Sequence, residues 1–424
     1  MVLKAGLVKR VASRFIQYRV YSRSLAKGLN MDLPALYLKP NEDKRLRAGH
    51  LWVFSNEVDS KRCRLPDFAP GQLAQILAQD GKFLGTGYVN PNSLICARLL
   101  SRDPDHLPGR SLFIHRLKIA LSLREHFYAQ PFYRLVFGEA DGLPGLVVDR
   151  YNDVLVAQIT TAGMECLKDE IVAALEKVIK PRGILFRSDS PMRQLEGIPT
   201  SIEEIGTVPD EVLLTEGECS FRAPLKQGQK TGWFFDQHDN RTALAPYVKG
   251  GQVLDVFSYL GAWGIQAARA GATKVSCVES SATAGEILVD NASRNGFDVE
   301  LISEDAFTAL PRLREEGRHF DTVIVDPPAF IKRRKDIGAG SKAYRRINQL
   351  ALTLVEPGGF LITGSCSYHM SADSFVQNVQ AAARHVDRNL QLLECAGQGR
   401  DHPIHPAIPE TAYLKMFYFR VLKN

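Results

Sequence analysis

The second half of the chain alternates strand-like and helix-like segments, and this alternation restricts the fold more than any other feature of the sequence. Short apolar and β-branched runs are each followed by a longer segment with apolar residues at helical spacing. Such an order favours a doubly wound, Rossmann-like α/β fold with a parallel sheet and right-handed crossovers. We expect strands at 252–257, 274–278, 299–302, 320–325 and 360–363, and helices at 262–270, 282–295, 306–316, 344–354 and 371–385.

The residues before this region follow a different pattern. From Ala35 onward, short alternating runs are separated by Gly, Pro and Asn, which predicts a small β-rich domain. A mixture of helical and strand-like segments then predicts a small central α/β domain. A chain of 424 residues is long enough for more than one core. We therefore expect an N-terminal extension at 1–34 and domains at 35–110, 111–218 and 219–424.

The N-terminal extension is basic. Residues 1–30 contain seven Lys or Arg side chains and no acidic one, whereas the whole chain has a net charge of +6, so the remainder is close to neutral. Three interpretations stay open: a transit-like peptide, a basic arm for nucleic acid, or an over-long start with Met31 as the initiator. Any RNA-binding surface on the remainder must then be a local patch.

The seven cysteines are scattered, with no CxxC pair and no histidine at metal-ligand spacing. This pattern predicts neither a disulfide framework nor a metal site, and it favours a reducing, cytoplasmic location. No apolar stretch reaches the roughly 18 residues that a transmembrane helix needs. We therefore expect a soluble protein without a membrane partner.

A glycine-containing turn follows the first strand of the predicted sheet. This strand includes Asp255 and ends at Phe257, and it runs into the segment Ser258-Tyr-Leu-Gly-Ala-Trp-Gly264. Gly261 would let the backbone approach a ligand closely, and the start of the following helix offers free N–H groups. Turns of this kind are common in α/β proteins, so the turn alone is weak evidence of a nucleotide-like ligand.

Acidic residues follow the next two strands. Glu279, with Ser280 after it, is placed to accept hydrogen bonds from two ribose hydroxyls. Asp305, with Ala306 after it, could accept one from an adenine amine. Taken singly, each acid could equally cap a helix or place a charge in its first turn. The succession of three such strand ends favours a nucleoside-containing cofactor.

This arrangement resembles the class I S-adenosylmethionine-dependent methyltransferases. The resemblance implies that the glycine turn cradles the amino-acid part of the cofactor, that Glu279 holds the ribose and that Asp305 holds the adenine. A dinucleotide oxidoreductase is disfavoured because GxGxxG is absent. Lys230, Gln237 and Arg241 precede the first strand and could hold the carboxylate of the cofactor, although the aromatic residues among them could instead pack a domain junction.

The segment Asp326-Pro-Pro-Ala-Phe330 follows the fourth strand. Pro327 and Pro328 rigidify the turn, so that the carboxylate of Asp326 faces the substrate and cofactor. Similar turns serve adenine-N6, guanine-N2 and cytosine-C5 methyltransferases. The turn therefore predicts a nucleobase substrate, with Pro327, Pro328 and Phe330 beside it, without identifying the base.

The run Thr363-Gly-Ser-Cys-Ser367 follows the fifth strand and supplies a candidate nucleophile, Cys366. Carbon-5 of cytosine is barely nucleophilic until a thiolate adds to carbon-6. A helix N-terminus or a neighbouring cation can lower the pKa of such a thiol. We expect the remaining cysteines to be small hydrophobic residues: Cys63, Cys96, Cys166, Cys219, Cys277 and Cys395.

Further motifs narrow the resemblance. In chain order they are residues 46–56, 138–145, 230–237 with Arg241, 326–328 and 365–367. From about residue 35 to its C-terminus, the chain is similar to the bacterial ribosomal RNA large subunit methyltransferase I family. This resemblance implies a PUA RNA-binding domain at 35–110 and methylation of carbon-5 of a cytosine in 23S rRNA, with S-adenosylmethionine as cofactor. Many RNA cytosine-C5 enzymes outside this family carry a second cysteine where this chain has Ala329, so either another base removes the C5 proton or the reaction differs.

Basic residues after the Asp-Pro-Pro turn could contact RNA phosphates or form a solvated loop. They are Lys332, Arg333 and Arg334. In the first domain, Arg47 and Trp52 suit RNA backbone contact and base stacking, although Trp52 could equally belong to the core.

Two other functions stay open: a guanine-N2 or adenine-N6 RNA methyltransferase in which Cys366 is incidental, and a non-catalytic RNA-binding protein with a methyltransferase fold. The sequence leaves the oligomeric state undecided, with a homodimer as one expectation.

Overall fold

The computed structural model describes residues 33–228 and 231–423. The chain divides into two compact units, one comprising the residues up to Pro209 together with Asp401–Thr411, the other comprising Asp210–Arg400 and the residues from Ala412 onward. The first unit therefore takes in a short segment from near the end of the sequence. The predicted domain boundaries at 110 and 218 stay predictions.

The first unit begins with a five-stranded sheet in the order β1-β3-β4-β5-β2. Its alternating apolar residues form a core that includes Leu36, Val53 and Ile76. The predicted β-rich domain is thus confirmed as a β-structure. The elements are β1 (Ala35–Tyr37), α2 (Lys44–Arg47), β2 (Trp52–Phe54), β3 (Gln72–Leu77), β4 (Phe83–Val89) and β5 (Ile95–Ser101).

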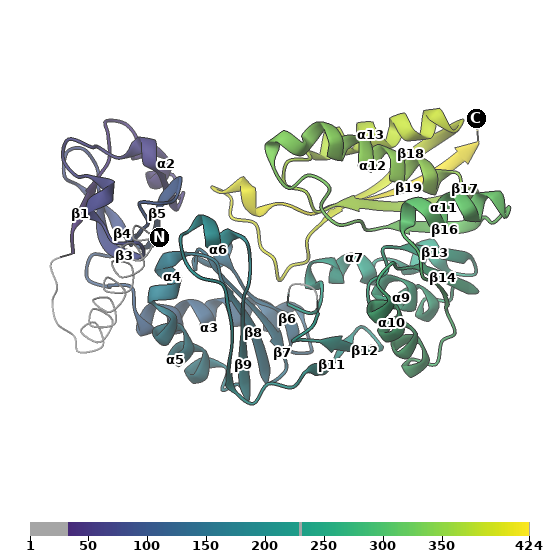
Figure 1. Ribbon diagram of the computed structural model, residues 1–424, viewed down its shortest axis with the longest axis horizontal. Coiled ribbons are helices and arrows are strands. Elements are labelled where there is room, and N and C mark those ends of the chain that lie inside the picture. The colour runs from purple at the N-terminus through teal and green to yellow at the C-terminus, as the bar shows by residue number, and fades with distance from the viewer. Residues whose placement is uncertain (1–32, 229–230, 424) are drawn as a thin grey trace, which may run out of the picture. The chain divides into compact units, whose positions relative to one another are not determined.

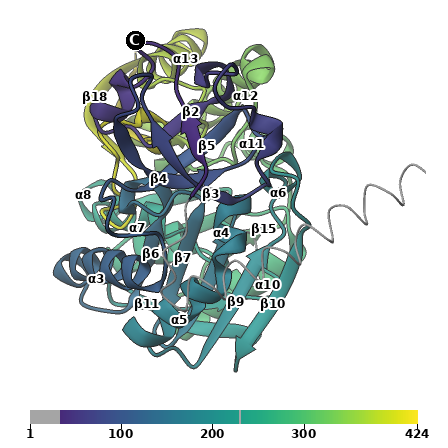
Figure 2. The ribbon, with the colours of Figure 1, turned by 90° about the vertical axis from the view of Figure 1, so that its left-hand side faces the viewer.

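A second five-stranded sheet of this unit has the order β10-β9-β8-β7-β6. Helices α3 and α5 pack over it through apolar residues that include Phe113, Leu117 and Ile171 (Figure 2). The helical segment after β8 is divided at Leu167 into two helices, α4 and α5. The elements are α3 (Arg110–Phe127), β6 (Phe132–Phe137), β7 (Leu146–Tyr151), β8 (Val154–Ile159), α4 (Ala162–Cys166), α5 (Lys168–Val178), β9 (Gly183–Ser188), α6 (Met192–Leu195) and β10 (Ser201–Gly206).

The two sheets of the first unit share a core. The Tyr88 hydroxyl of β4 donates to the Pro144 carbonyl at 2.8 Å and to Thr161 at 3.1 Å. The Tyr88 ring lies so close to Gly163 that a Cβ there would fall 1.9 Å from the ring. The late segment is anchored as well, because Arg124 donates to the Asp401 carbonyl at 2.6 Å.

The second unit contains a hairpin and a seven-stranded sheet in the order β15-β14-β13-β16-β17-β19-β18. The first five of these strands run parallel, as predicted, and β19 and β18 add an antiparallel edge that was not predicted. The strands are β11 (Glu211–Glu216), β12 (Cys219–Pro224), β13 (Gln252–Val256), β14 (Lys274–Val278), β15 (Glu300–Ile302), β16 (Phe320–Val325), β17 (Val355–Ser365), β18 (Arg388–Gly397) and β19 (Lys415–Lys423).

Helices cover both faces of this sheet, with α12 and α13 on one side and α9 and α10 on the other (Figure 1). Helix α13 illustrates how the sequence places a helix on the sheet, because Phe375, Val379 and Ala383 recur at helical spacing and form a buried apolar face. The Ser371 side chain caps the first turn of this helix. The helices are α7 (His238–Thr242), α8 (Ala245–Val248), α9 (Ala262–Arg269), α10 (Ala282–Arg294), α11 (Ala306–Glu315), α12 (Ile337–Leu352) and α13 (Ala372–His385).

Helix α12 begins seven residues earlier than predicted, at Ile337 rather than 344. Gly338 and Gly340 weaken the helical pattern there, since glycine is a poor helix former. The structure needs a small residue at Gly340, because a Cβ would lie 2.3 Å from Ile331 and 2.8 Å from the Phe330 carbonyl. The loop after β16 therefore packs directly on the first turns of α12.

Candidate functional site

Most of the predicted cofactor and catalytic residues lie at the carboxyl ends of five neighbouring parallel strands, β15, β14, β13, β16 and β17. Parallel strands present their carboxyl ends at one edge of a sheet, where ligands of such folds bind. The structure therefore brings the predicted cofactor residues and the predicted catalytic residues to the same edge.

The turn after β13 has an unusual backbone. Phe257 and Tyr259 have φ values of 67° and 51°, in a region that residues other than glycine rarely adopt. Gly261 has a φ of 83°. The Ser258 hydroxyl donates to the Asp255 carbonyl at 2.8 Å and so holds the turn. Strained residues of this kind cluster where a backbone must fit a ligand.

Asp255 is fully buried beneath this turn. One carboxyl oxygen, Oδ2, accepts from the Gly264 N–H at 3.0 Å, whereas Oδ1 has no hydrogen-bond partner among residues 33–228 and 231–423. Burial raises the pKa of Asp255 to about 7. The carboxyl is therefore available to a hydrogen-bonding or cationic ligand group that reaches Oδ1.

The two carboxylates predicted to hold a nucleoside also stabilise local structure. Glu279 accepts from the Tyr259 N–H at 2.8 Å and from the Ser281 N–H at 2.7 Å. Asp305 caps α11 by accepting from the Phe307 N–H at 2.8 Å. Each carboxylate oxygen has more than one acceptor site, so these bonds leave capacity for ligand hydroxyl or amine groups. Ser280 and Ala306 follow the two acids directly.

Asp326 directly follows β16 and lies between two hydrogen-bond donors. Its Oδ1 accepts from Gln237 Nε2 at 2.9 Å and its Oδ2 from Trp263 Nε1 at 3.1 Å. Desolvation raises the pKa of Asp326 to about 6 despite these two bonds. Near neutral pH, this carboxyl can therefore exchange between an acceptor and a donor of hydrogen bonds.

Cys366 lies beside the Asp-Pro-Pro turn. Its thiol faces the Pro327 carbonyl, with the sulfur 3.9 Å from the oxygen. The next residue, Ser367, accepts from the Ile331 N–H at 3.1 Å and lies 2.8 Å from the Tyr344 hydroxyl. The turn after β16 and the turn after β17 are thus joined by side-chain bonds, and the sulfur lies at their junction.

Phe330 connects the two halves of the site. Its ring packs against Phe257, Phe307 and Tyr344, with centroid separations of 6.4, 6.1 and 4.8 Å. Pro328 is exposed and Pro327 is buried. Lys332, Arg333 and Arg334 are all exposed, and Arg333 pairs with Asp336 at 3.2 Å.

Arg241 does not lie free beside the cofactor turn. It forms a buried ion pair with Glu216, in which Nε and Nη2 lie 2.5 and 2.6 Å from the carboxylate oxygens, and it donates to the Phe234 carbonyl. Its predicted role toward the cofactor stays a prediction, as does that of Gln237, which contacts Asp326. Lys230 lies outside the described residues.

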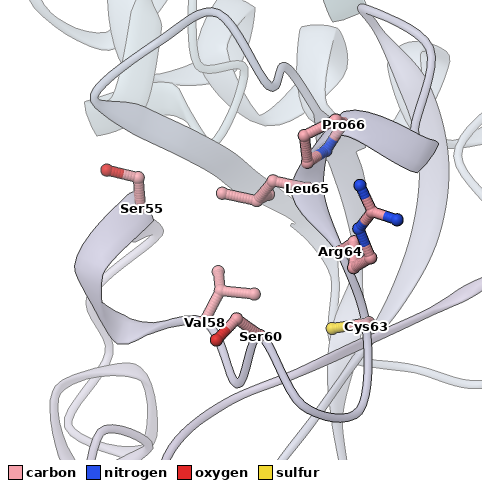
Figure 3. A pocket seen from close by; sticks show the side chains of 7 residues that line it. All are labelled: Ser55, Val58, Ser60, Cys63, Arg64, Leu65 and Pro66. Carbon is pink, nitrogen blue, oxygen red and sulfur yellow. The ribbon is translucent and has the colours of Figure 1, made fainter.

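The two residues predicted to contact RNA in the first unit lie close to acidic side chains. Arg47 is exposed and pairs with Asp43 at 2.5 Å, and the half-buried Trp52 donates from Nε1 to Glu139 at 2.9 Å. Neither lines a cavity of about 310 Å³ that lies in this unit. That cavity is lined by Ser55, Val58, Ser60, Cys63, Arg64, Leu65 and Pro66 (Figure 3).

Sequence reasoning did not single out three residues of the site: Trp263, Tyr344 and Lys415. Trp263 belongs to the glycine turn motif, so the sequence placed it near the predicted cofactor site. The sequence did not indicate its hydrogen bond to Asp326. Tyr344 and Lys415 come from segments distant in sequence, and no spacing pattern points to either. Lys415 Nζ donates to the Ser367 and Met370 carbonyls, which flank the site.

Known families match both parts of the chain. Residues 36–102 match a PUA-like domain. Residues 185–420, more than half of the chain, match the S-adenosylmethionine-dependent methyltransferases. The chain belongs to this family. It is therefore an S-adenosylmethionine-dependent methyltransferase with an N-terminal PUA-like domain, and the predicted family, fold class and cofactor are confirmed.

Relatives of similar length support the same assignment. The chain is 36% identical to ribosomal RNA large subunit methyltransferase I of Shewanella denitrificans over 91% of its own length and 98% of that protein. It is 37% identical to the protein of the same name from Aeromonas hydrophila, over 90% and 98% of the two chains. The chain thus belongs to the large subunit methyltransferase I family within the broader methyltransferase family.

Solved structures share the fold of the methyltransferase. SMU.776, assigned as a methyltransferase and complexed with SAH, has a TM-score of 0.78 and 22% identity, covering 92% of this chain and all of its own. A protein from Streptococcus mutans, assigned to the SAM-dependent methyltransferases, has a TM-score of 0.77 at the same identity and coverage.

Two further findings concern metal sites and membrane-spanning helices. Within the part of the chain that the structure describes, no group of three or more His, Cys, Asp and Glu side chains could hold a metal ion. None of the helices described there is both long and apolar enough to cross a membrane.

Proposed function

We propose that this methyltransferase modifies carbon-5 of a cytosine in the RNA of the large ribosomal subunit, 23S rRNA, with Cys366 as the covalent nucleophile. The observation that carries the proposal is the position of the Cys366 sulfur, 3.9 Å from the Pro327 carbonyl at the ends of adjacent parallel strands. The names of the full-length relatives support ribosomal RNA as the substrate.

The residues at the strand ends fit S-adenosylmethionine. The strained turn from Phe257 to Gly261 would hold its amino-acid part above the buried Oδ1 of Asp255. Glu279 would accept from the ribose hydroxyls and Asp305 from the adenine amine. When bound, the cofactor supplies an electrophilic methyl group.

Cys366 and Asp326 would act on the base. The Cys366 thiolate adds to carbon-6, forming an S–C bond, and the electron pair displaced from the ring double bond makes carbon-5 nucleophilic. After carbon-5 takes the methyl group, a base removes its proton and the S–C bond breaks. Asp326, with a pKa near 6, can accept from the cytosine amine when ionised and donate to the ring nitrogen when protonated.

The target cytosine must reach this edge of the sheet unpaired or flipped out of its helix, because the reacting atoms of a stacked, paired base are not accessible to the enzyme. The exposed cations Lys332, Arg333 and Arg334 follow the base-side turn and suit phosphate contact. The PUA-like domain, with Arg47 and Trp52, would supply a second RNA contact. A homodimer and a cytoplasmic location stay predictions.

Identification of the methylated nucleoside tests the proposal. Wild type and the variants Cys366→Ala and Cys366→Ser are incubated with large-subunit rRNA and methyl-labelled cofactor, and the RNA is digested to nucleosides. We expect 5-methylcytidine from wild type and no detectable product from either variant. Cys395→Ala is the matched control, because Cys395 is exposed on β18, and we expect it to retain wild-type activity.

A second measurement detects the covalent step directly. RNA that contains 5-fluorocytosine should remain attached to the wild type, because fluorine cannot leave carbon-5 as a proton does. The adduct should be absent from Cys366→Ala. Methylated guanine or adenine, or wild-type activity of Cys366→Ala, would instead support the amine-methylating alternatives, and wild type that binds RNA without transferring a methyl group would support a binding protein.

A further inference from the structure

A half-buried lysine lies against the Cys366 turn. Lys415 is the first residue of β19 and pairs with Ser365 across the antiparallel ladder between β17 and β19. Its Nζ then reaches past Cys366 and donates to the Ser367 carbonyl at 2.8 Å and to the Met370 carbonyl at 2.7 Å. The ladder fixes the backbone of Lys415 beside Ser365, and the two carbonyl bonds hold its ammonium group against the backbone that follows Cys366.

In this position the ammonium group of Lys415 is partly desolvated. Lys415 is half-buried, and desolvation lowers its pKa to about 8, whereas its electrostatic interaction with Cys366 raises that pKa. The interaction is reciprocal: a thiolate that favours the ammonium form is itself favoured by the ammonium to the same extent. Lys415 donates both bonds to neutral carbonyls, which carry no negative charge to neutralise the ammonium group.

Other titratable groups around Cys366 do not supply a positive charge in the same way. Tyr344 of α12 interacts with Cys366 electrostatically, and its pKa is raised by burial. Asp326 precedes Pro327 and is acidic, so its ionised form opposes a thiolate. Tyr368 and His369 follow Cys366 on its own segment, and Tyr368 is 46% exposed. Hydrogen bonds to the carbonyls of Ser367 and Met370 thus fix the cation of Lys415 beside the Cys366 turn.

We propose that Lys415 is a positioning residue whose ammonium group stabilises the thiolate of Cys366 and holds the Cys366 turn in place. The inference rests on the proposed function, because it gives the charge state of the nucleophile. In the step concerned, the S–H bond breaks, its electron pair stays on sulfur and the proton leaves to solvent. The bonds of the Lys415 ammonium group are unchanged, and no further reactant is needed.

The pH dependence of Cys366 alkylation tests this inference without RNA or cofactor. The full chain is pulsed with iodoacetamide at a series of pH values, and modification of the Cys366 peptide is followed by mass spectrometry. Lys415→Gln keeps hydrogen-bond donors but removes the charge, and we expect it to shift the midpoint upward by about one pH unit, with roughly tenfold slower alkylation near neutral pH. Lys415→Arg should stay close to wild type.

Controls separate charge from folding. Lys423→Met changes an exposed lysine of the same strand and should leave the midpoint unchanged. Lys415→Met removes both charge and donors, so a shift shared by the Gln and Met variants identifies charge as the cause. Midpoints equal to wild type in both variants would overturn the inference, as would a shift equally large in Lys415→Arg.

The outcome is independent of the methylation experiment. A shifted midpoint together with an active Cys366→Ala variant would retain the charge interaction and reject the proposed nucleophile. An unshifted midpoint together with an inactive Cys366→Ala variant would reject the role of Lys415 and retain the nucleophile.

Discussion

The hydroxyl oxygen of Tyr344 lies 2.8 Å from the hydroxyl oxygen of Ser367, in the interior of the methyltransferase unit. Tyr344 also accepts from the Phe330 N–H at 3.4 Å, and Ser367 accepts from the Ile331 N–H at 3.1 Å. These bonds connect helix α12, the segment after the Asp-Pro-Pro turn and the residue that follows Cys366. The distance between the base-side turn and the sulfur therefore depends on a pair of hydroxyl groups.

Tyr344→Phe should reduce both stability and turnover. Removing the hydroxyl leaves buried partners without a hydrogen bond, which costs about 1–2 kcal/mol of unfolding free energy. We expect kcat to fall several-fold while the affinity for the cofactor changes little. Urea unfolding and methylation kinetics provide the two readouts. Tyr133→Phe is the matched control, since its buried hydroxyl accepts from Arg150 at 2.9 Å in the other unit. An equal loss of turnover in both variants would show a general effect of destabilisation.

Trp263→Phe should raise the pKa of Asp326 further above about 6. The indole N–H donates to Asp326 at 3.1 Å and stabilises the ionised carboxylate, so its removal favours the protonated form. The limb of the pH–rate profile that reports Asp326 should therefore move to higher pH. Trp233→Phe serves for comparison, because its indole N–H donates to Glu216 instead. A shift in the opposite direction would be incompatible with this bond.

Glu216→Ala should be strongly destabilising. Glu216 and Arg241 are 2% and 4% exposed, and removing the carboxylate leaves the guanidinium buried without its ionic partner. Losses of about 3–5 kcal/mol are typical of such changes. Chemical unfolding of the full chain measures the loss. Glu316→Ala, which breaks an exposed pair with Arg312, should have a far smaller effect, and comparable losses would contradict the role of burial.

The five parallel strands of the methyltransferase sheet and the residues at their ends could be predicted from the sequence, whereas the spatial order of the strands and many contacts around the site could not. Buried parallel strands such as β16 are continuous apolar runs, and the turns that follow them carry the ligand residues. The edge strand β18 lacks this signal, because many of its residues are exposed. The short strand β10 contains two isoleucines separated by two glutamates, so it also lacks a continuous apolar run.

Pairing between distant residues accounts for the other differences. The role of Arg241 toward the cofactor stays a prediction, whereas its ion pair with Glu216 depends on the position of the β11–β12 hairpin, which the sequence did not reveal. Lys415 reaches the Cys366 turn only because β19 inserts antiparallel beside β17. A local pattern identifies a residue type and an element, whereas these contacts arise from tertiary register.

Asp255 should make the unfolding free energy of the methyltransferase depend on pH. Its pKa is about 7 in the folded chain, against an ordinary value of 3.8, because burial disfavours the ionised form. Between roughly pH 4 and pH 7 the folded state therefore binds more protons than the unfolded state, and the contribution of this group to stability is lost as pH rises through 7. The full change corresponds to roughly 4 kcal/mol.

Asp255→Asn removes this titration while retaining an oxygen that can accept from the Gly264 N–H. We expect the stability of the variant to fall less steeply than that of wild type between pH 5 and pH 8, as measured by urea unfolding of the cofactor-free protein. Glu286→Gln, on α10, provides a control for the loss of one carboxylate. Parallel pH profiles for wild type and Asp255→Asn would show that Asp255 is already ionised in the folded state, because only a carboxyl that takes up a proton on folding changes the slope.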